Sequence, residues 1–131
     1  MLNPFNIGDK KTYQYTVKNT DFAAFDEEGL IHPVLSTFKI AKCAEWVCRL
    51  FVHEMKEEGE EGVGVMVSVN HHSPALENEI VTFEAELIKV EKNKVICHWK
   101  ATVNERLIAN GEQIQKIIDV KKFYKTLANL Q

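Results

Sequence analysis

Three polar side chains have types suited to nucleophilic and acid–base chemistry: the hydroxyl of Thr37, the carboxylate of Glu45 and the imidazole of His71. Such groups attack an electrophile, orient a water molecule or transfer protons. Thr37 and Glu45 fall on a predicted helix, where eight residues at a rise of 1.5 Å place them about 12 Å apart along the axis. This separation is too long for a hydrogen bond, but it spans a cleft for a small molecule.

Thr37 and Glu45 also have simpler explanations. Ser36 or Thr37 can cap the helix, and a hydroxyl there also lies beside free N–H groups that favour developing negative charge. Glu45 shares its helix row with apolar residues, which predicts a partly desolvated carboxylate able to act as base or nucleophile. The competing explanation is an ion pair with Arg49, one turn further along the helix.

His71 has the same strand parity as Val63, Val65, Val67 and Val69. Alternate residues of a strand share a face, so we expect its imidazole to point towards the helix and His72 to point away. A histidine satisfied by backbone groups remains the alternative. The histidines and cysteines show no metal-ligand spacing, so no metal and no cofactor is predicted.

Gly62 and Gly64 interrupt the same valine-rich strand. Glycine inside a strand indicates either a close approach of backbone or ligand, or a β-bulge, and the sequence leaves both open. Cys43 is predicted to be a buried structural thiol rather than a nucleophile.

The order of predicted elements is distinctive, because only one long helix interrupts a series of strands. Alternation predicts a first strand, a stretch without periodicity predicts a loop or short helical lid, and spacings of three and four predict the helix. Short polar breaks make the last three strands antiparallel hairpins. The predicted elements are a strand over 11–18, the loop or lid over 20–33, a helix from 36 or 37 to about 56, strands over 63–69, 79–90, 94–103 and 106–118, and a short helix over 120–130.

This layout predicts an α+β fold in which a curved antiparallel sheet wraps one long central helix, the hotdog arrangement. A chain of 131 residues fits a single domain over residues 1–131. One helix covers one face of the sheet and the open edges need partners, so we expect a homodimer in which two sheets join side by side.

Composition narrows the class of partner. The formal charge of −3 and the pI near 6.0 give no basic field for nucleic acid. No apolar stretch approaches the roughly 20 residues that cross a bilayer, and no secretory leader is visible, so no membrane association and a cytoplasmic location are expected. The odd number of cysteines, 3, predicts reduced thiols.

Four short segments together resemble the hotdog-fold thioesterases similar to fluoroacetyl-CoA thioesterase. The segments are His32–Thr37, Ala44–Glu45, Val63–Gly64 and Val67–His71. The resemblance covers roughly residues 34–111 and implies that Thr37, Glu45 and His71 form the catalytic set. It also implies substrate binding at Gly64, through its backbone, and at Ser36.

The resemblance implies hydrolysis of an acyl-CoA by a homodimer or a dimer of dimers. An acyl-thioester dehydratase and a non-catalytic acyl-CoA-binding module are the alternatives. Two departures bear on the substrate: Gly111 is followed by Gln113 and Gln115 where the family often has a His-x-Arg element, and the aromatic gate associated with fluoroacetyl-CoA falls on Ile31, which argues against that substrate.

Overall fold

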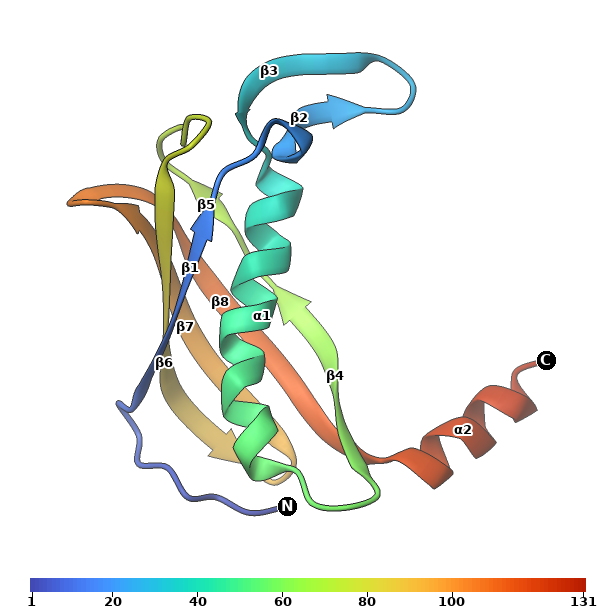
Figure 1. The fold of residues 1–131 in the computed structure, drawn as a ribbon. Coiled ribbons are helices and arrows are strands. Elements are labelled where there is room, and N and C mark those ends of the chain that lie inside the picture. Colours follow the sequence, from blue (N-terminus) through green and yellow to red (C-terminus); the bar gives the residue numbers. More distant parts are fainter.

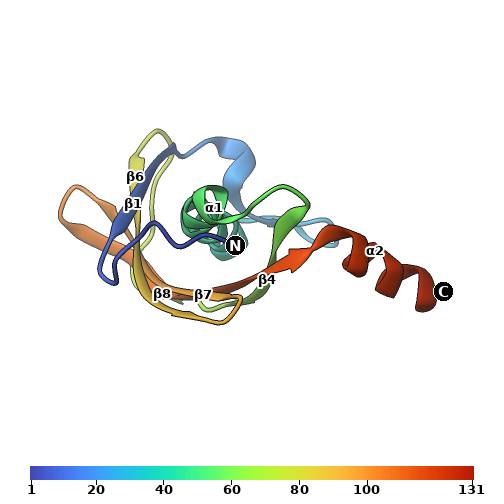
Figure 2. The ribbon, with the colours of Figure 1, turned by 90° about the horizontal axis from the view of Figure 1, so that it is seen from below.

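A curved antiparallel sheet wraps one long helix in the computed structural model, which describes residues 1–131 (Figures 1 and 2). The elements in chain order are β1 (Lys10–Thr16), the short 3-10 helix η1 (Asn19–Asp21), β2 (Phe22–Phe25), β3 (Gly29–Leu35), α1 (Thr37–Met55), β4 (Glu60–Val67), β5 (Asn70–His71), β6 (Ile80–Glu91), β7 (Lys94–Val103), β8 (Arg106–Asp119) and α2 (Val120–Asn129).

The main sheet has the strand order β1-β6-β7-β8-β4, and β5 also pairs with β8. All pairings are antiparallel, so hairpins join β6 to β7 and β7 to β8. β1 and β4 therefore lie at opposite edges of the sheet. Seen along the helix, the sheet curls around α1, and α2 projects from the end of β8 past β4 (Figure 2).

α1 forms because its apolar residues recur at spacings of three and four and its first turn is capped. The Ser36 hydroxyl accepts a hydrogen bond from the Lys39 N–H at 3.1 Å. The helix ends at Met55, and Gly59, at φ 83°, then reverses the chain into β4 in a conformation that favours glycine. The buried residues of α1 are Ile40, Cys43, Ala44, Val47, Cys48, Phe51, Val52 and Met55.

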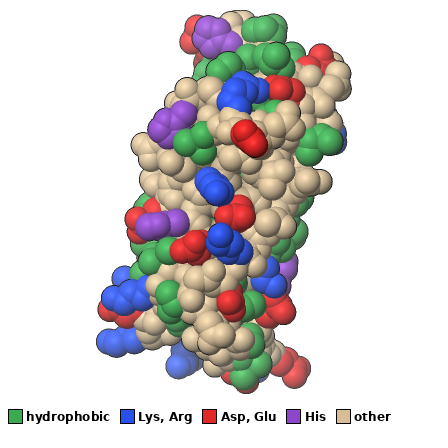
Figure 3. All heavy atoms as spheres, turned by 90° about the vertical axis from the view of Figure 1, so that its left-hand side faces the viewer, with side chains coloured by type: hydrophobic (Ala, Val, Ile, Leu, Met, Phe, Trp, Pro, Cys, Tyr) green, Lys and Arg blue, Asp and Glu red, His purple; other side chains and the backbone are tan.

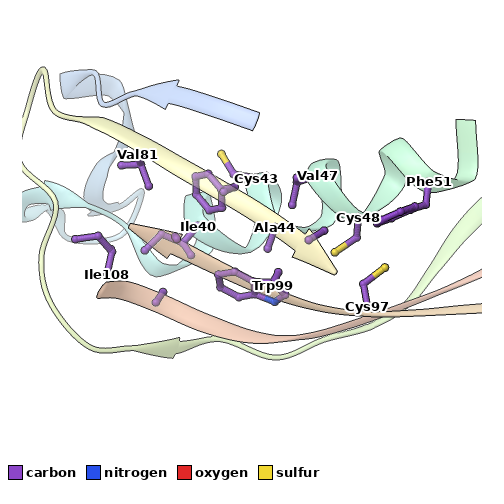
Figure 4. Packing of buried hydrophobic residues seen from close by; sticks show 14 of the residues in the cluster. Ile40, Cys43, Ala44, Val47, Cys48, Phe51, Val81, Cys97, Trp99 and Ile108 are labelled. Atoms are coloured by element: carbon purple, nitrogen blue, oxygen red, sulfur yellow. The ribbon is translucent and has the colours of Figure 1, made fainter. Parts of the chain in front are cut away.

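The core lies between α1 and the concave face of the sheet (Figure 4). Phe83 on β6 and Trp99 on β7 pack with ring centroids 6.3 Å apart. Cys48 and Cys97 point their sulfur atoms towards each other across the helix–sheet boundary, and both thiols are free and buried. Large side chains on both the helix and the strands fill this side of α1.

The segment over residues 20–33 differs from the predicted loop or short helical lid. It contains η1 and then a separate two-stranded sheet formed by β2 and β3. The register shifts between Phe22 and Ala23 and again between Ala23 and Ala24. Side chains of this hairpin therefore do not alternate regularly between two faces, and the sequence lacks the alternation of apolar and polar residues that indicates strands. The other predicted elements are confirmed to within a few residues at their ends.

The side of the molecule formed by β1 and β6 carries interspersed cationic and anionic side chains (Figure 3). Lys10 and Lys100 both lie within 4.0 Å of Glu84, at 3.6 and 3.8 Å. Charged side chains of this kind discourage a sheet edge from pairing with another chain. Neither helix of the protein is both long and apolar enough to cross a bilayer.

Candidate active site

Thr37 and His71 meet at the start of α1. The Thr37 Oγ1 atom lies 2.9 Å from the His71 Nδ1 atom, within hydrogen-bond distance. The Thr37 hydroxyl is free for this contact because Ser36, not Thr37, caps the helix. The structure thus brings together two of the residues predicted from the sequence, and the buried Ser36 fixes the turn that holds one of them.

The prediction that Val63, Val65, Val67 and Val69 share the face that packs on the helix was wrong for Val63, whereas Val69 does pack against the core. Val63 pairs with Lys116 on the outer face of the sheet, whereas Gly62 and Gly64 face α1. The register then shifts between Gly64 and Met66, which marks a β-bulge. A bulge inserts one extra residue and exchanges the two faces, so the alternation over 63–69 does not describe one face.

His71 nevertheless points inward, as predicted, because it lies beyond the bulge. It pairs with Ala109, which is fully buried on the concave face. Gly111 lets the chain reach this position, since a side chain there would collide with the Ser68 carbonyl. Ser68, between β4 and β5, accepts a hydrogen bond from the Glu112 N–H at 2.9 Å and so holds this segment on β8.

Glu45 lies against the backbone of Gly64. A Cβ atom built on Gly64 would come within 2.5 Å of the Glu45 Oε1 atom, so any larger residue there would displace the carboxylate. The expected ion pair between Glu45 and Arg49 is absent. Arg49 instead donates to Glu61 at 2.7 Å and to the Gly62 carbonyl at 3.3 Å, which leaves the Glu45 carboxylate without a partner in the chain.

The side chain of Glu45 is exposed, not partly desolvated as its helix row predicted. Its neighbours in the row are covered by the sheet, but opposite Glu45 the strand offers a glycine and nothing that covers the carboxylate. The close approach and the bulge, both left open by the sequence, therefore both occur in β4. Together they leave space beside a carboxylate.

A surface cavity of about 410 Å³ opens beside Glu45. It carries three cationic side chains and two aromatic rings, and its lining residues are Tyr13, Lys39, Lys42, Cys43, Glu45, Trp46 and Arg49. Cys43 contributes no nucleophile, because burial raises the pKa of its thiol to about 11. Glu45 is thus the one carboxylate among the residues that line this cavity.

Gln113 and Gln115 form a buried polar pair that the sequence analysis treated only as a departure from the family pattern. The Gln115 Nε2 atom donates to the Gln113 Oε1 atom at 3.1 Å, and Gln115 lies directly behind Gly62. The sequence did offer a signal for their burial: Gln113 and Gln115 alternate with the apolar Ile117 along β8, and alternate residues of a strand share a face. They form the neutral floor beneath the glycines of β4.

A small ion-pair network holds the start of β4 on the helix. Glu61 accepts from Lys56 at 2.8 Å and from Arg49 at 2.7 Å. The Lys56 contact, followed by the Gly62 N–H, lowers the pKa of Glu61 to about 2. Glu61 thereby fixes Arg49 away from Glu45.

Comparison with known proteins gives one family and a set of similar folds. The family model described as fluoroacetyl-CoA-specific thioesterase matches residues 17–121. No curated protein sequence matches the chain. The chain is 29% identical to a hypothetical protein of Thermus thermophilus described as a thioesterase superfamily member, over 98% of this chain and 95% of that one, with a TM-score of 0.94.

Two further solved structures share the fold. The fluoroacetyl-CoA thioesterase FlK is 21% identical, with 97% of this chain and 98% of that chain covered and a TM-score of 0.89. A hot-dog-like protein from Thermanaerovibrio acidaminovorans is 22% identical, with 95% and 92% covered and a TM-score of 0.87. The α+β hotdog architecture predicted from the sequence is thereby confirmed. Its concave side carries a hydroxyl–imidazole pair and, further along the same helix, a free carboxylate.

Proposed function

Because the chain belongs to the family of fluoroacetyl-CoA-specific thioesterases and is therefore an acyl-CoA thioesterase, we propose that Thr37, Glu45 and His71 are its catalytic residues. The observation that carries this proposal is the 2.9 Å contact between Thr37 and His71, which joins the start of α1 to the end of β5. The unpaired Glu45 carboxylate on the same helix supports it.

Hydrolysis breaks the bond between the acyl carbon and sulfur, adds water and releases CoA thiol and a carboxylic acid. On one route Glu45 or Thr37 attacks the thioester carbonyl, CoA thiol leaves, and water then hydrolyses the acyl-enzyme to the free acid. On the other route one of them orients a water molecule that attacks the carbonyl directly. His71 accepts a proton during attack and delivers one to the departing sulfur. The backbone N–H of Gly64 stabilises the oxyanion, and no step requires a metal or a cofactor.

Ser36 acts in substrate binding through its cap. Its buried hydroxyl orders the first turn of α1, so the free N–H groups of that turn face the reacting carbonyl beside Thr37. The cavity beside Glu45 suits the CoA portion of the substrate, because Lys39 and Lys42 complement phosphate groups, whereas Arg49 is held by Glu61. A variant of FlK binds acetyl-CoA, which supports CoA thioesters as the substrate class.

The acyl group is not expected to be fluoroacetyl. The hairpin of β2 and β3 carries Ile31 at the position assigned to the family's aromatic gate, and its side chain is 39% exposed. An aliphatic side chain there lacks the aromatic ring of the gate. We expect another acyl group to be preferred.

The active unit is proposed to be a homodimer joined through β4. At this edge Val65, Met66 and Val67 are 50%, 36% and 38% exposed, whereas the edge strand β1 carries lysines. Pairing of two β4 strands would bury this apolar row and satisfy the free backbone groups of the edge. Light scattering at micromolar concentration should give twice the 15.0 kDa chain mass, and a monomer would contradict the assignment.

The 3 free cysteines support a cytoplasmic location, because reducing compartments keep thiols unpaired.

The test of the proposed function is thiol release from a panel of short, branched, aromatic and long acyl-CoAs, with fluoroacetyl-CoA included. Hydrolysis of at least one member, abolished by Glu45→Gln, is the expected result. Conversion of 3-hydroxyacyl-CoA and enoyl-CoA without thiol release would instead identify a dehydratase. Saturable binding with no turnover would identify a binding module.

A further inference from the structure

α2 is an amphipathic helix that finds no partner within its own chain. None of its residues is buried, and its apolar side chains Tyr124, Leu127 and the adjoining Leu130 are 63%, 37% and 77% exposed. Its cationic residues Lys121 and Lys125 make no ion pair. A helix of 10 residues in this state is marginal in water unless its apolar stripe is covered.

A second unpartnered surface lies on the hairpin of β2 and β3. Its apolar side chains Phe25, Leu30 and Ile31 are 51%, 60% and 39% exposed. The hairpin turn carries Asp26, Glu27 and Glu28, which also make no ion pair, and residues 19–38 contain no lysine or arginine. The hairpin is therefore apolar and anionic where α2 is apolar and cationic.

The two surfaces cannot meet within one chain, because they lie at opposite ends of the molecule, although both project towards the β4 side (Figure 1). α2 starts directly after Asp119, which pairs with Glu60 at the first residue of β4. The hairpin leads into Thr37 at the other end of α1. In the proposed dimer, a two-fold axis beside β4 exchanges these two ends.

We propose that α2 of each subunit docks on the β2–β3 hairpin of the other, so that each active site is completed by its partner. This inference rests on the dimer through β4 described under the proposed function. The occupant is a second copy of this chain. The two-fold axis beside β4 brings the partner's apolar, anionic hairpin to the end of β4 from which α2 projects. Phe25 contacts Phe38, the neighbour of Thr37, with ring centroids 5.7 Å apart, so docking of α2 fixes the hairpin beside the catalytic hydroxyl.

Chemical cross-linking tests the contact directly. A chain carrying Glu28→Cys and Lys125→Cys is treated with a short bismaleimide, and covalent dimers are counted on a denaturing gel. Cys43, Cys48 and Cys97 are buried and should not react. The matched control replaces Lys125→Cys by Lys100→Cys, at a comparably exposed lysine on the outer face of β7.

Most of the Glu28→Cys/Lys125→Cys protein should become covalent dimer, and the control should stay monomeric on the gel. Charge reversal provides a second readout: Lys125→Glu should weaken the dimer by about three- to thirtyfold, because symmetry loses two surface pairs of up to about 1 kcal/mol each. Adding Glu28→Lys to the same chain should restore the affinity, and Lys100→Glu should leave it unchanged.

Absence of the cross-link in a protein that is dimeric by light scattering would overturn the inference, while retained thiol release would leave the proposed function standing. A monomer by light scattering would overturn the docking together with the β4 dimer. Sedimentation with phosphatidylserine vesicles in place of cross-linking would identify α2 as a membrane-surface helix and would also overturn it.

Discussion

The two flanks of α1 differ in what the sheet places against them: large side chains on one flank, and the backbone of a glycine on the other. On the flank that faces β6 and β7, Val47 and Phe51 are fully buried, and large side chains such as Trp99 extend from the sheet towards the helix (Figure 4). On the flank that faces β4, Glu45 stands exposed opposite the bare backbone of Gly64. Close packing on both sides stabilises a fold, whereas a polar side chain opposite a missing side chain creates space for a substrate. The same helix therefore anchors the core and carries the proposed catalytic residues Thr37 and Glu45.

The largest expected effect comes from removing the carboxylate on the β4 flank. Glu45→Gln and Glu45→Ala should each lower turnover by about 10³- to 10⁵-fold, as expected for a member of a catalytic set. The free energy of unfolding should change by less than about 0.5 kcal/mol, because the exposed side chain has no partner to lose. Thiol release and urea unfolding measure the two quantities.

Arg49→Ala is the control for Glu45, because Arg49 lies one turn away on the same flank and pairs with Glu61. Most of the turnover should remain. Equal losses of turnover in Arg49→Ala and Glu45→Ala would indicate that both residues act structurally. The β4 flank would then not differ in role from the packed flank.

The next effect concerns the imidazole at the other end of this flank. His71→Ala should lower kcat by about 10²- to 10⁴-fold, the usual contribution of a positioned acid or base, with a smaller change in KM. His72→Ala should be nearly silent, since His72 bonds to Asn110 at 3.0 Å and not to Thr37. Stopped-flow thiol release separates kcat from KM, and full activity in folded His71→Ala would remove His71 from the catalytic set.

The packed flank should respond in the opposite way. Phe51→Ala should lower the free energy of unfolding by about 3–5 kcal/mol, because it leaves a cavity in the core and removes the edge-on contact with Phe5 at 4.9 Å. Activity per folded molecule should persist. Ile80→Ala, at a side chain that is 54% exposed, should cost less than about 1 kcal/mol. Loss of activity from folded Phe51→Ala would show that the two flanks are not independent.

The sequence predicted the packed flank better than the β4 flank. Spacings of three and four in α1 and alternation in β6 to β8 report burial directly, and those elements were found close to their predicted ends. The β-bulge after Gly64 has no such signal, so Val63 was assigned to the wrong face of β4, while the inward direction of His71, beyond the bulge, was right. The partner of Arg49 was also beyond reach, because contacts between α1 and β4 depend on where the chain turns at Gly59.

The proposed catalytic set was predicted from residue types and family spacing rather than from burial. Thr37 and His71 do meet, as that pattern implied. Exposure of Glu45 was not foreseen, because a helix row shows which residues share a face but not what covers each of them. Long-range packing, not local propensity, decides that question.

The smallest effect is a pH-dependent one on the β4 flank, at Glu61. Lys56 and the Gly62 N–H hold the pKa of this carboxyl at about 2, below the ordinary value of 4.5. A lowered folded-state pKa contributes stability that is fully present above about pH 4.5 and is lost as the pH falls towards 2. Since the side chain is 36% exposed, solvent screening limits the contribution to about 0.3–1 kcal/mol.

Urea unfolding should therefore show Glu61→Gln less stable than the wild type at pH 7, with the difference shrinking at pH 3 and in high salt. Turnover should stay within about threefold, because the ion pair positions Arg49 and does not touch Glu45. A stability difference that is the same at both pH values would mean that Glu61 acts by packing, and the β4 flank would then resemble the core flank more than its charges suggest.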